Sequence, residues 1–424
     1  MTSGIRAISE RAPDLRQELR RFVRFLLAEL KPKGPVLTPF NVITTAILAT
    51  TVVILTIRFI FGLGSVTNLS QNVPWGLWIG FDVIAGVAFA GGAYVITFLV
   101  YIMRVEKYTP ILRVTVLNGF LAYLFYTGAL LLDLGRPWHV VNPMIGNSFG
   151  VSSVLFLVAW HFMLYLTALF FEFSPAIAEW LGWNRVRRTL NALTLGGVIF
   201  GITLSILHQS GLGALYLMAR DKIHPLWYNE FLPLLFLVSS IFAGLSMVIT
   251  EGSVTHKIFH HRLGSTLKAT NDDIVFGLAR IATATMFVYL FMHVLVLVHG
   301  QRFPYLRTGW GAWYLLEMVG CTAVPAALYA WGCTSRRMPV IRIAAVLAMV
   351  GILLNRLNVS IIAFKWYSPV RYVPTWMEIV VTLGVLSAEL WVYRWVVNRM
   401  PVLDFDMAHE DRPMMMPAVV RPAA

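Results

Sequence analysis

The stretch LWIGFDVIAGVAFAGGAYVITFLVYIM, residues 77–103, decides the fold class. It is longer than the roughly 20 apolar residues that a helix needs to cross a hydrocarbon core of about 30 Å. Asp82 is the one charged residue within it. The stretch therefore predicts a helix that spans a membrane and carries a single acid.

Further apolar runs of similar length bring the number of predicted spans to ten. The composition agrees, because 13% of the residues are charged and 58% are hydrophobic, whereas soluble domains contain about 25% charged residues. We therefore expect an all-α integral membrane protein and exclude a set of soluble domains. The predicted spans lie at 40–61, 77–103, 114–134, 149–171, 190–216, 231–250, 274–299, 313–331, 341–362 and 376–396.

The basic residues predict the orientation of these spans. The net charge is +13, but the Lys and Arg residues lie in short segments between apolar runs, which indicates membrane orientation and not nucleic-acid binding. Most of them fall in the terminal segments and in the loops on the same side, so both termini are predicted to be cytoplasmic. We expect a multi-pass protein of the bacterial cytoplasmic (inner) membrane with its motif-rich loops on the periplasmic side.

The two terminal segments are predicted to lie outside the membrane. Residues 1–39 contain no apolar core, so we expect no cleavable signal peptide. Within them, residues 6–30 alternate basic and apolar positions at helical spacing, which favours an interfacial helix, with a partner-binding helix as the alternative. Residues 397–424 form a cytoplasmic tail with little expected order.

Redox centres and metals are limited by the ligand inventory. Cys321 and Cys333 are too few for a disulfide framework, a Cys-rich zinc site or an iron–sulfur cluster. The histidines within spans are His161, His208 and His293, at roughly 18, 12 and 9 Å from the outer end by helical rise. Because no two share a depth, we expect no haem, no cluster and no metal site in this chain.

Ionisable residues inside spans are costly and therefore informative. Asp82, Asp133 and His208 lie in the outer half of their spans and are candidates for chemistry. A second set could carry protons toward the cytoplasm, although each of its members could instead fix helix packing through a hydrogen bond or ion pair, for instance Glu317 with Arg356. This set consists of His161, Arg280, His293, Glu317, Arg356 and Glu389.

The outer loops and adjoining span ends hold long motifs rich in aromatic residues, Gly and Pro. An aromatic belt at the headgroup level accounts for some of the tryptophans, but not for the acids and histidines beside them. The sequence around these residues resembles the NrfD/polysulfide-reductase membrane subunits, in particular their ten-span HybB-type branch. The resemblance runs from about residue 36 to about 398, and its motifs are NVPWGLWIGFDV, GVAFAGGAY, LDLGRPWH, LHQSGLGALY, HPLWY and RLNVS.

The resemblance implies a fold of two four-helix bundles. The first, residues 77–216, would hold the quinone pocket, and the second would comprise residues 231–362. The spans at 40–61 and 376–396 would flank them. It also implies the quinone-reactive subunit of a hydrogenase:quinone or menaquinone reductase type of complex, without a redox centre of its own.

Site residues follow from the matching motifs. Reduction of a quinone needs two electrons and two protons, so its carbonyl groups require a hydrogen-bond donor and a carboxyl group that resupplies protons. Asp82, Asp133 and His208 are the implied catalytic residues. The implied quinone-binding residues are Trp75, Asp82, Asp133, His139, His208 and Gln209.

Implied partners are a periplasmic ferredoxin-like iron–sulfur subunit and a catalytic subunit, either a hydrogenase, a molybdopterin-type protein or a multihaem cytochrome. The other implied partners are lipid and a quinone, either menaquinone or another one. The resemblance also leads us to expect proton translocation. Two other classes remain open from sequence: a secondary transporter with two helical repeats, in which paired repeats and buried charges would look similar, and a purely structural membrane anchor.

Overall fold

The computed structural model describes residues 15–71, 73, 75–142 and 153–403. The chain divides into two compact units, residues 1–46 and 47–424. The predicted segments 1–14 and 404–424, and the predicted start of the fourth span at 149–152, lie outside the described residues. In the first unit, α1 (Leu15–Leu30) covers the described part of the expected amphipathic helix.

The described residues contain ten helical segments that are long and apolar enough to cross a membrane, which confirms the predicted number and the all-α class. No strand occurs among the described residues. The spans are α2 (Pro39–Phe61), Trp78–Ile102, Glu106–Asp133 with α5 (Thr109–Asp133), Phe156–Trp180 within α7 (Val154–Trp180), α8 (Asn184–Leu217), α9 (Leu232–Ile258), α10 (Ser265–His299), Gly309–Thr334, Met338–Ile362 and α14 (Trp376–Val397).

Some helices extend beyond the apolar runs that predicted them. The third span begins at Glu106 and not at 114. Pro110 does not interrupt it, because this proline stands in the first turn of α5, where its missing N–H costs nothing. The seventh begins at Ser265 and not at 274, and its first turns are polar. Hydropathy locates the part of a helix inside lipid, and polar turns continue it beyond.

In the described part of the chain, three spans are interrupted by wide, π-helical turns, which are rare and frequently occur at functional sites. The second span consists of η2 (Trp78–Ala85), α3 (Gly86–Phe89), α4 (Gly91–Thr97) and η3 (Phe98–Ile102). The eighth consists of α11 (Gly309–Leu315), η8 (Leu316–Ala323) and α12 (Val324–Thr334), and the ninth of α13 (Met338–Leu357) and η9 (Asn358–Ile362). Asp82 lies in η2 and Glu317 in η8.

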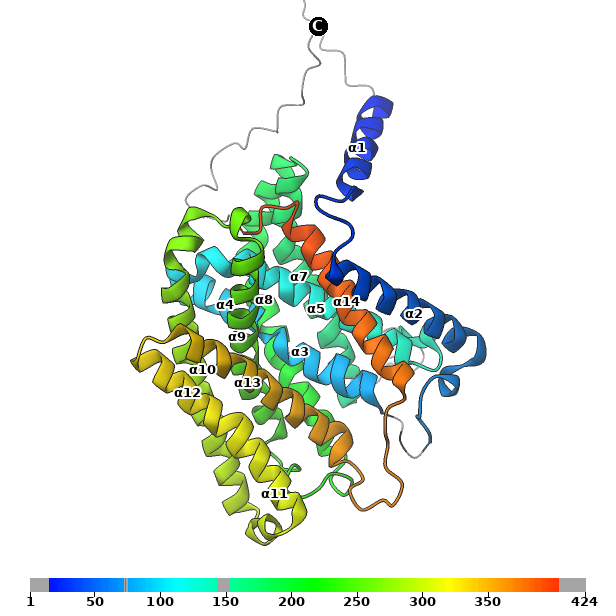
Figure 1. Ribbon diagram of the computed structural model, residues 1–424, viewed down its shortest axis with the longest axis vertical. Helices are drawn as coiled ribbons and strands as arrows, with labels where there is room; N and C mark the ends of the chain where they lie inside the picture. The colour runs from blue at the N-terminus through cyan, green and yellow to red at the C-terminus, as the bar shows by residue number, and fades with distance from the viewer. Residues whose placement is uncertain (1–14, 72, 74, 143–152, 404–424) are drawn as a thin grey trace, which may run out of the picture. The chain divides into compact units, whose positions relative to one another are not determined.

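Helix packing places α9 at the centre of the second unit. It packs on α8 and α4 as well as on α10 and α13, while α14 packs on α5 and η2, as Figure 1 shows. The approach of α4 to α9 depends on glycines, since a Cβ atom at Gly244 would overlap the backbone of Gly91 and Gly92. Helix α9 thus contacts helices of both predicted four-helix bundles. The division into two bundles stays a prediction, and so does the cytoplasmic orientation of the termini.

Candidate functional site

Asp82 is held inside the protein by the wide turn of η2 and is fully buried. Neither of its carboxylate oxygens has a hydrogen-bond partner among the described residues. The hydroxyl of Thr382 faces it without normal hydrogen-bond geometry, and the carboxyl groups of Asp133 and Glu389 act on it electrostatically. An unsatisfied buried carboxyl group costs free energy, so Asp82 stands out as a group available for a ligand or a proton.

Asp133 ends α5 beside a buried arginine. The guanidinium of Arg58 donates to the carbonyl oxygen of Leu132 at 2.9 Å and to that of Leu134, and its charge acts on Asp133. Arg136, the cation next to Asp133 in the LGRPW motif, is exposed. Arg58 lies inside the first predicted span, and its position beside Asp133 depends on the packing of α2 on the end of α5.

His208 is fully buried on α8 and is held by a tyrosine of α5. Its Nδ1 lies 3.0 Å from the hydroxyl of Tyr123, and its Nε2 has no partner among the described residues. The ring of Phe162 packs at 5.0 Å from the imidazole, centroid to centroid. When the Tyr123 hydroxyl donates to Nδ1, the neutral imidazole carries its proton on Nε2 and is a donor there.

The other predicted pocket residues differ in position. Gln209 is buried and donates through Nε2 to the carbonyl oxygen of Val87 at 2.9 Å, so it fixes α8 on α3. Trp75 is half-buried and packs edge-on against Tyr216, with centroids 6.0 Å apart. His139 is exposed in the turn Pro137–His139, where its Nδ1 pairs with the side chain of Asn142 at 2.8 Å.

Asp82 and His208 interact with different tyrosines of α5, Asp82 electrostatically and His208 through a hydrogen bond. Tyr126 interacts with Asp82, and Tyr123 with His208. The two tyrosines are three residues apart and therefore neighbours on the helix surface. A Cβ atom at Gly86 would overlap the ring of Tyr126, so this glycine admits the ring beside η2. Sequence analysis missed both tyrosines, because a tyrosine in an apolar span carries no signal of its own.

Glu317 is fully buried and accepts from three side chains. Trp227 Nε1 donates at 2.7 Å and Asn355 Nδ2 at 2.6 Å, and Asn358 is the third donor. The Arg356 guanidinium donates to Asn355 Oδ1 at 2.8 Å. The ion pair considered for Glu317 and Arg356 is thus bridged by Asn355.

The remaining predicted path residues are dispersed. His293 is buried on α10, with Nδ1 3.0 Å from the hydroxyl of Tyr314. His161 is half-buried on α7 and acts electrostatically on His208. Arg280 is exposed and lines a surface pocket with Lys107, so no described contact brings it to the other path residues. Glu389 instead joins the group around Asp82.

The HPLWY motif forms a folded cap outside the spans. The backbone N–H of His224 donates to the carbonyl oxygen of Ala363 at 3.0 Å, and its Nδ1 accepts from the N–H of Leu226 at 3.2 Å. The imidazole is buried against the rings of Trp310 and Trp366. This burial lowers the pKa of His224 to about 4.

We predict that the cap loses stability as the pH falls from about 6.5 to about 4. The unfolded chain binds the proton near pH 6.5, before the folded state does, so acid favours unfolding within this window. Thermal unfolding midpoints between pH 7 and pH 4 measure the effect. His224→Asn keeps an acceptor for Leu226 but cannot titrate, so its midpoint should fall less, while the exposed-site variant His261→Asn should follow wild type. Equal pH dependence in His224→Asn and wild type would contradict this assignment.

The fold and the buried groups define a class: a multi-pass membrane protein with acids and histidines buried in its interior. The family model described as Polysulphide reductase, NrfD, matches residues 65–364. The chain belongs to this family, as the sequence motifs predicted.

Three relatives support the assignment. A protein of Nitratidesulfovibrio vulgaris Hildenborough is 44% identical over 88% of this chain and 97% of its own length. The probable Ni/Fe-hydrogenase 2 b-type cytochrome subunit of Escherichia coli K12 is 28% identical over 82% of this chain and 88% of its own. A selenate reductase subunit of Mesobacillus selenatarsenatis is 22% identical over 43% and 48%, respectively. These matches support the predicted class, a membrane subunit of a respiratory oxidoreductase.

The expectation that this chain holds no haem is corrected by this comparison, because the E. coli relative is named as a b-type cytochrome subunit. The expectation rested on helical depth alone. The structure provides two buried imidazoles, those of His208 and His293, whose Nε2 atoms have no partner among the described residues. A histidine nitrogen is a usual axial ligand of haem iron, so these two residues fit the ligand type. No group of three His, Cys, Asp or Glu suited to another metal occurs in the described part of the chain.

Proposed function

We propose that this protein is the quinone-reactive membrane subunit of its oxidoreductase complex, and that it passes electrons between an iron–sulfur partner and menaquinone. The observation that carries the proposal is the pair of buried groups around α5. Asp82 offers two oxygens and His208 an Nε2 that have no hydrogen-bond partner in the part of the chain that the structure describes. A quinone carbonyl needs a donor like the His208 N–H, and a carboxyl group like that of Asp82 can resupply the proton.

Sidedness and partners complete the proposal. The chain would lie in the bacterial inner membrane with cytoplasmic termini, and the loops around the HPLWY cap would face a periplasmic iron–sulfur subunit and its catalytic partner. Quinone reduction would take two electrons from that partner and two protons from the protein. Asp133 and the aromatic wall of Trp75 would complete the pocket. A haem, when bound, would supply one-electron transfer, and with His208 donating to the quinone, His293 is the buried histidine that would ligate it. A reduced-minus-oxidised spectrum of the purified complex tests its presence.

His208→Leu is expected to lower quinone turnover by about tenfold to a hundredfold, since it removes a donor to the quinone carbonyl. Reduction of a short-chain menaquinone analogue by the intact complex, with reduced methyl viologen as electron donor, measures it. His208→Gln, which keeps an N–H donor, should recover part of the rate. The exposed-site variant His261→Leu should match wild type, and wild-type turnover in His208→Leu would overturn the role of His208.

A further inference from the structure

One face of α5 carries a row of polar residues separated by alanines. Asn118, Tyr126 and Asp133 are eight and seven residues apart, which places them on one side of the helix. Ala122 and Ala129 lie between them and are buried, so this face points into the protein. We call Asn118, Tyr126 and Asp133 the α5 stripe. Small residues between the polar ones leave their side chains within reach of a neighbouring helix.

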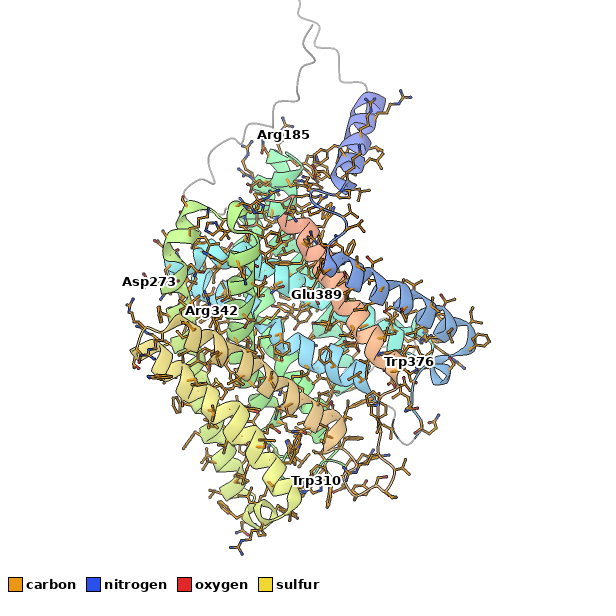
Figure 2. All side chains as sticks on the ribbon, in the orientation of Figure 1. Arg185, Asp273, Trp310, Arg342, Trp376 and Glu389 are labelled. Atoms are coloured by element: carbon orange, nitrogen blue, oxygen red, sulfur yellow. The ribbon has the colours of Figure 1, made fainter. Side chains whose placement is uncertain are left out.

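A matching row lies on α14. Glu378, Thr382, Glu389 and Tyr393 follow one another at intervals of four, seven and four residues, again on one helical face. We call them the α14 stripe. Glu378, Thr382 and Tyr393 are buried, and Glu389 lies about halfway along the helix, as Figure 2 shows. Of these four residues, only Glu389 was among the predicted path residues. The other three could not be selected from sequence, because their position beside α5 depends on how the two helices pack.

The two stripes face each other, since α14 packs on α5. At the outer end, the charge of Glu378 acts on Asp133. In the middle, the hydroxyl of Tyr126 interacts with the carboxyl group of Glu389. Asp82 joins from η2, where Glu389 acts on it. Polar groups thus continue from the outer end of α5 to the middle of the interface.

Glu251 of α9 extends the row toward the predicted cytoplasmic side. It accepts a hydrogen bond from the side chain of Asn118, and it interacts with the hydroxyl of Tyr393 and with Glu389. The same hydroxyl lies 3.1 Å from that of Thr255. Glu251 stands about two turns before the end of α9 at Ile258 and is half-buried. It is therefore the member placed to exchange protons with water.

A purely structural network would leave these acids satisfied, as Glu317 is by its three donors. Instead, both oxygens of Asp82 and one oxygen of Glu251 have no partner among the described residues. The two stripes themselves contain no Lys or Arg. Buried carboxylate oxygens without hydrogen-bond donors are costly, and acids inside membrane spans often belong to proton relays.

We propose that the facing stripes of α5 and α14 form a proton route from the predicted cytoplasmic side to Asp82. Protons enter at Glu251, pass to Glu389 beside Tyr126 and Tyr393, and reach Asp82. The proposal rests on the proposed function: each quinone takes two electrons from the iron–sulfur partner, two O–H bonds form on its oxygens, and the two protons given up are replaced through this route. In this proposal α14 contributes residues that carry protons to the quinone site.

The test uses the intact complex in sealed proteoliposomes with menaquinone and reduced methyl viologen. Glu389→Gln and Glu251→Gln should lower quinone reduction by about tenfold, and the membrane potential should fall with it. Tyr126→Phe should have a smaller effect in the same direction. Glu389→Asp, which keeps a carboxyl group, should recover part of the rate. Ser387→Ala, on α14 but bonded within its own helix, is the matched control.

The outcomes separate this route from others. Wild-type rates and potential in both Gln variants would overturn it. Glu172 is another acid inside a span, half-buried on α7, and its charge acts on Tyr165. A loss confined to Glu172→Gln would place the route there instead. Quinone reduction without any potential would exclude entry from the cytoplasm. Absence of quinone reduction in wild type itself would refute the proposed function and not this route alone.

Discussion

Asp82→Asn should lower quinone turnover by about a hundredfold while the complex still assembles. The substitution keeps the size of the side chain and removes the group that binds and releases a proton, and acid–base groups contribute about 10²- to 10⁴-fold to rates. Steady-state reduction of a menaquinone analogue by the purified complex measures the loss. Because neither oxygen of Asp82 has a partner within residues 15–71, 73, 75–142 and 153–403, Asn breaks no described hydrogen bond, and a stable complex is expected.

The exposed acid Asp273 on α10 provides the control for this experiment. Asp273→Asn should retain wild-type turnover. Asp82→Glu keeps the carboxyl group but lengthens the side chain in a fully buried site, so its rate should lie between those of wild type and Asp82→Asn. Undiminished turnover in Asp82→Asn would remove Asp82 from the chemistry and leave it a packing residue.

Gly244→Val should destabilise the fold by about 3 kcal/mol, the upper part of the usual cost of overpacking. Even a Cβ atom at Gly244 would overlap the backbone of Gly91 and Gly92, so α4 and α9 could not approach as they do. The thermal unfolding midpoint in detergent and the yield of assembled complex report the effect. Gly252→Val, on the same helix with open space around it, carries the same β-branched side chain and should cost much less. A similar loss of stability in both variants would mean that Gly244 is not required for the contact of α4 with α9.

Hydropathy was sufficient to predict the ten spans, because the energetic cost of polar residues in lipid acts on each helix separately. The wide turns of η2 and η8 could not be predicted, since they depend on which neighbouring helix occupies the space beside the turn. The same limit applied to helix ends. Polar turns that continue α10 beyond the lipid have no hydropathy signal.

Candidate acids were found because charges inside spans are rare, and Asp82 and Glu317 are both buried as expected. Their environments could not be read from sequence. Glu317 is saturated by donors from other segments, whereas Asp82 has none among the described residues. Depth along a helix does not tell in which direction a side chain points. Arg280 and Glu389 were both predicted path residues, but Arg280 is exposed, whereas Glu389 faces α5.

At the predicted outer end of the α5–α14 interface, the carboxylate of Glu378 differs from those of Asp82 and Glu251 because hydrogen-bond donors hold both of its oxygens. Its carboxylate accepts from the backbone N–H of Thr375 at 2.8 Å and of Asn68 at 3.2 Å, and from the hydroxyl of Tyr372. It also completes the capping box that begins α14. An acceptor tied down in this way cannot pick up and pass on a proton without breaking the start of its own helix. On the proposed route Glu378 is therefore a fixed hydrogen-bond acceptor and not a proton carrier, so protons that reach Asp82 would not leave through Glu378.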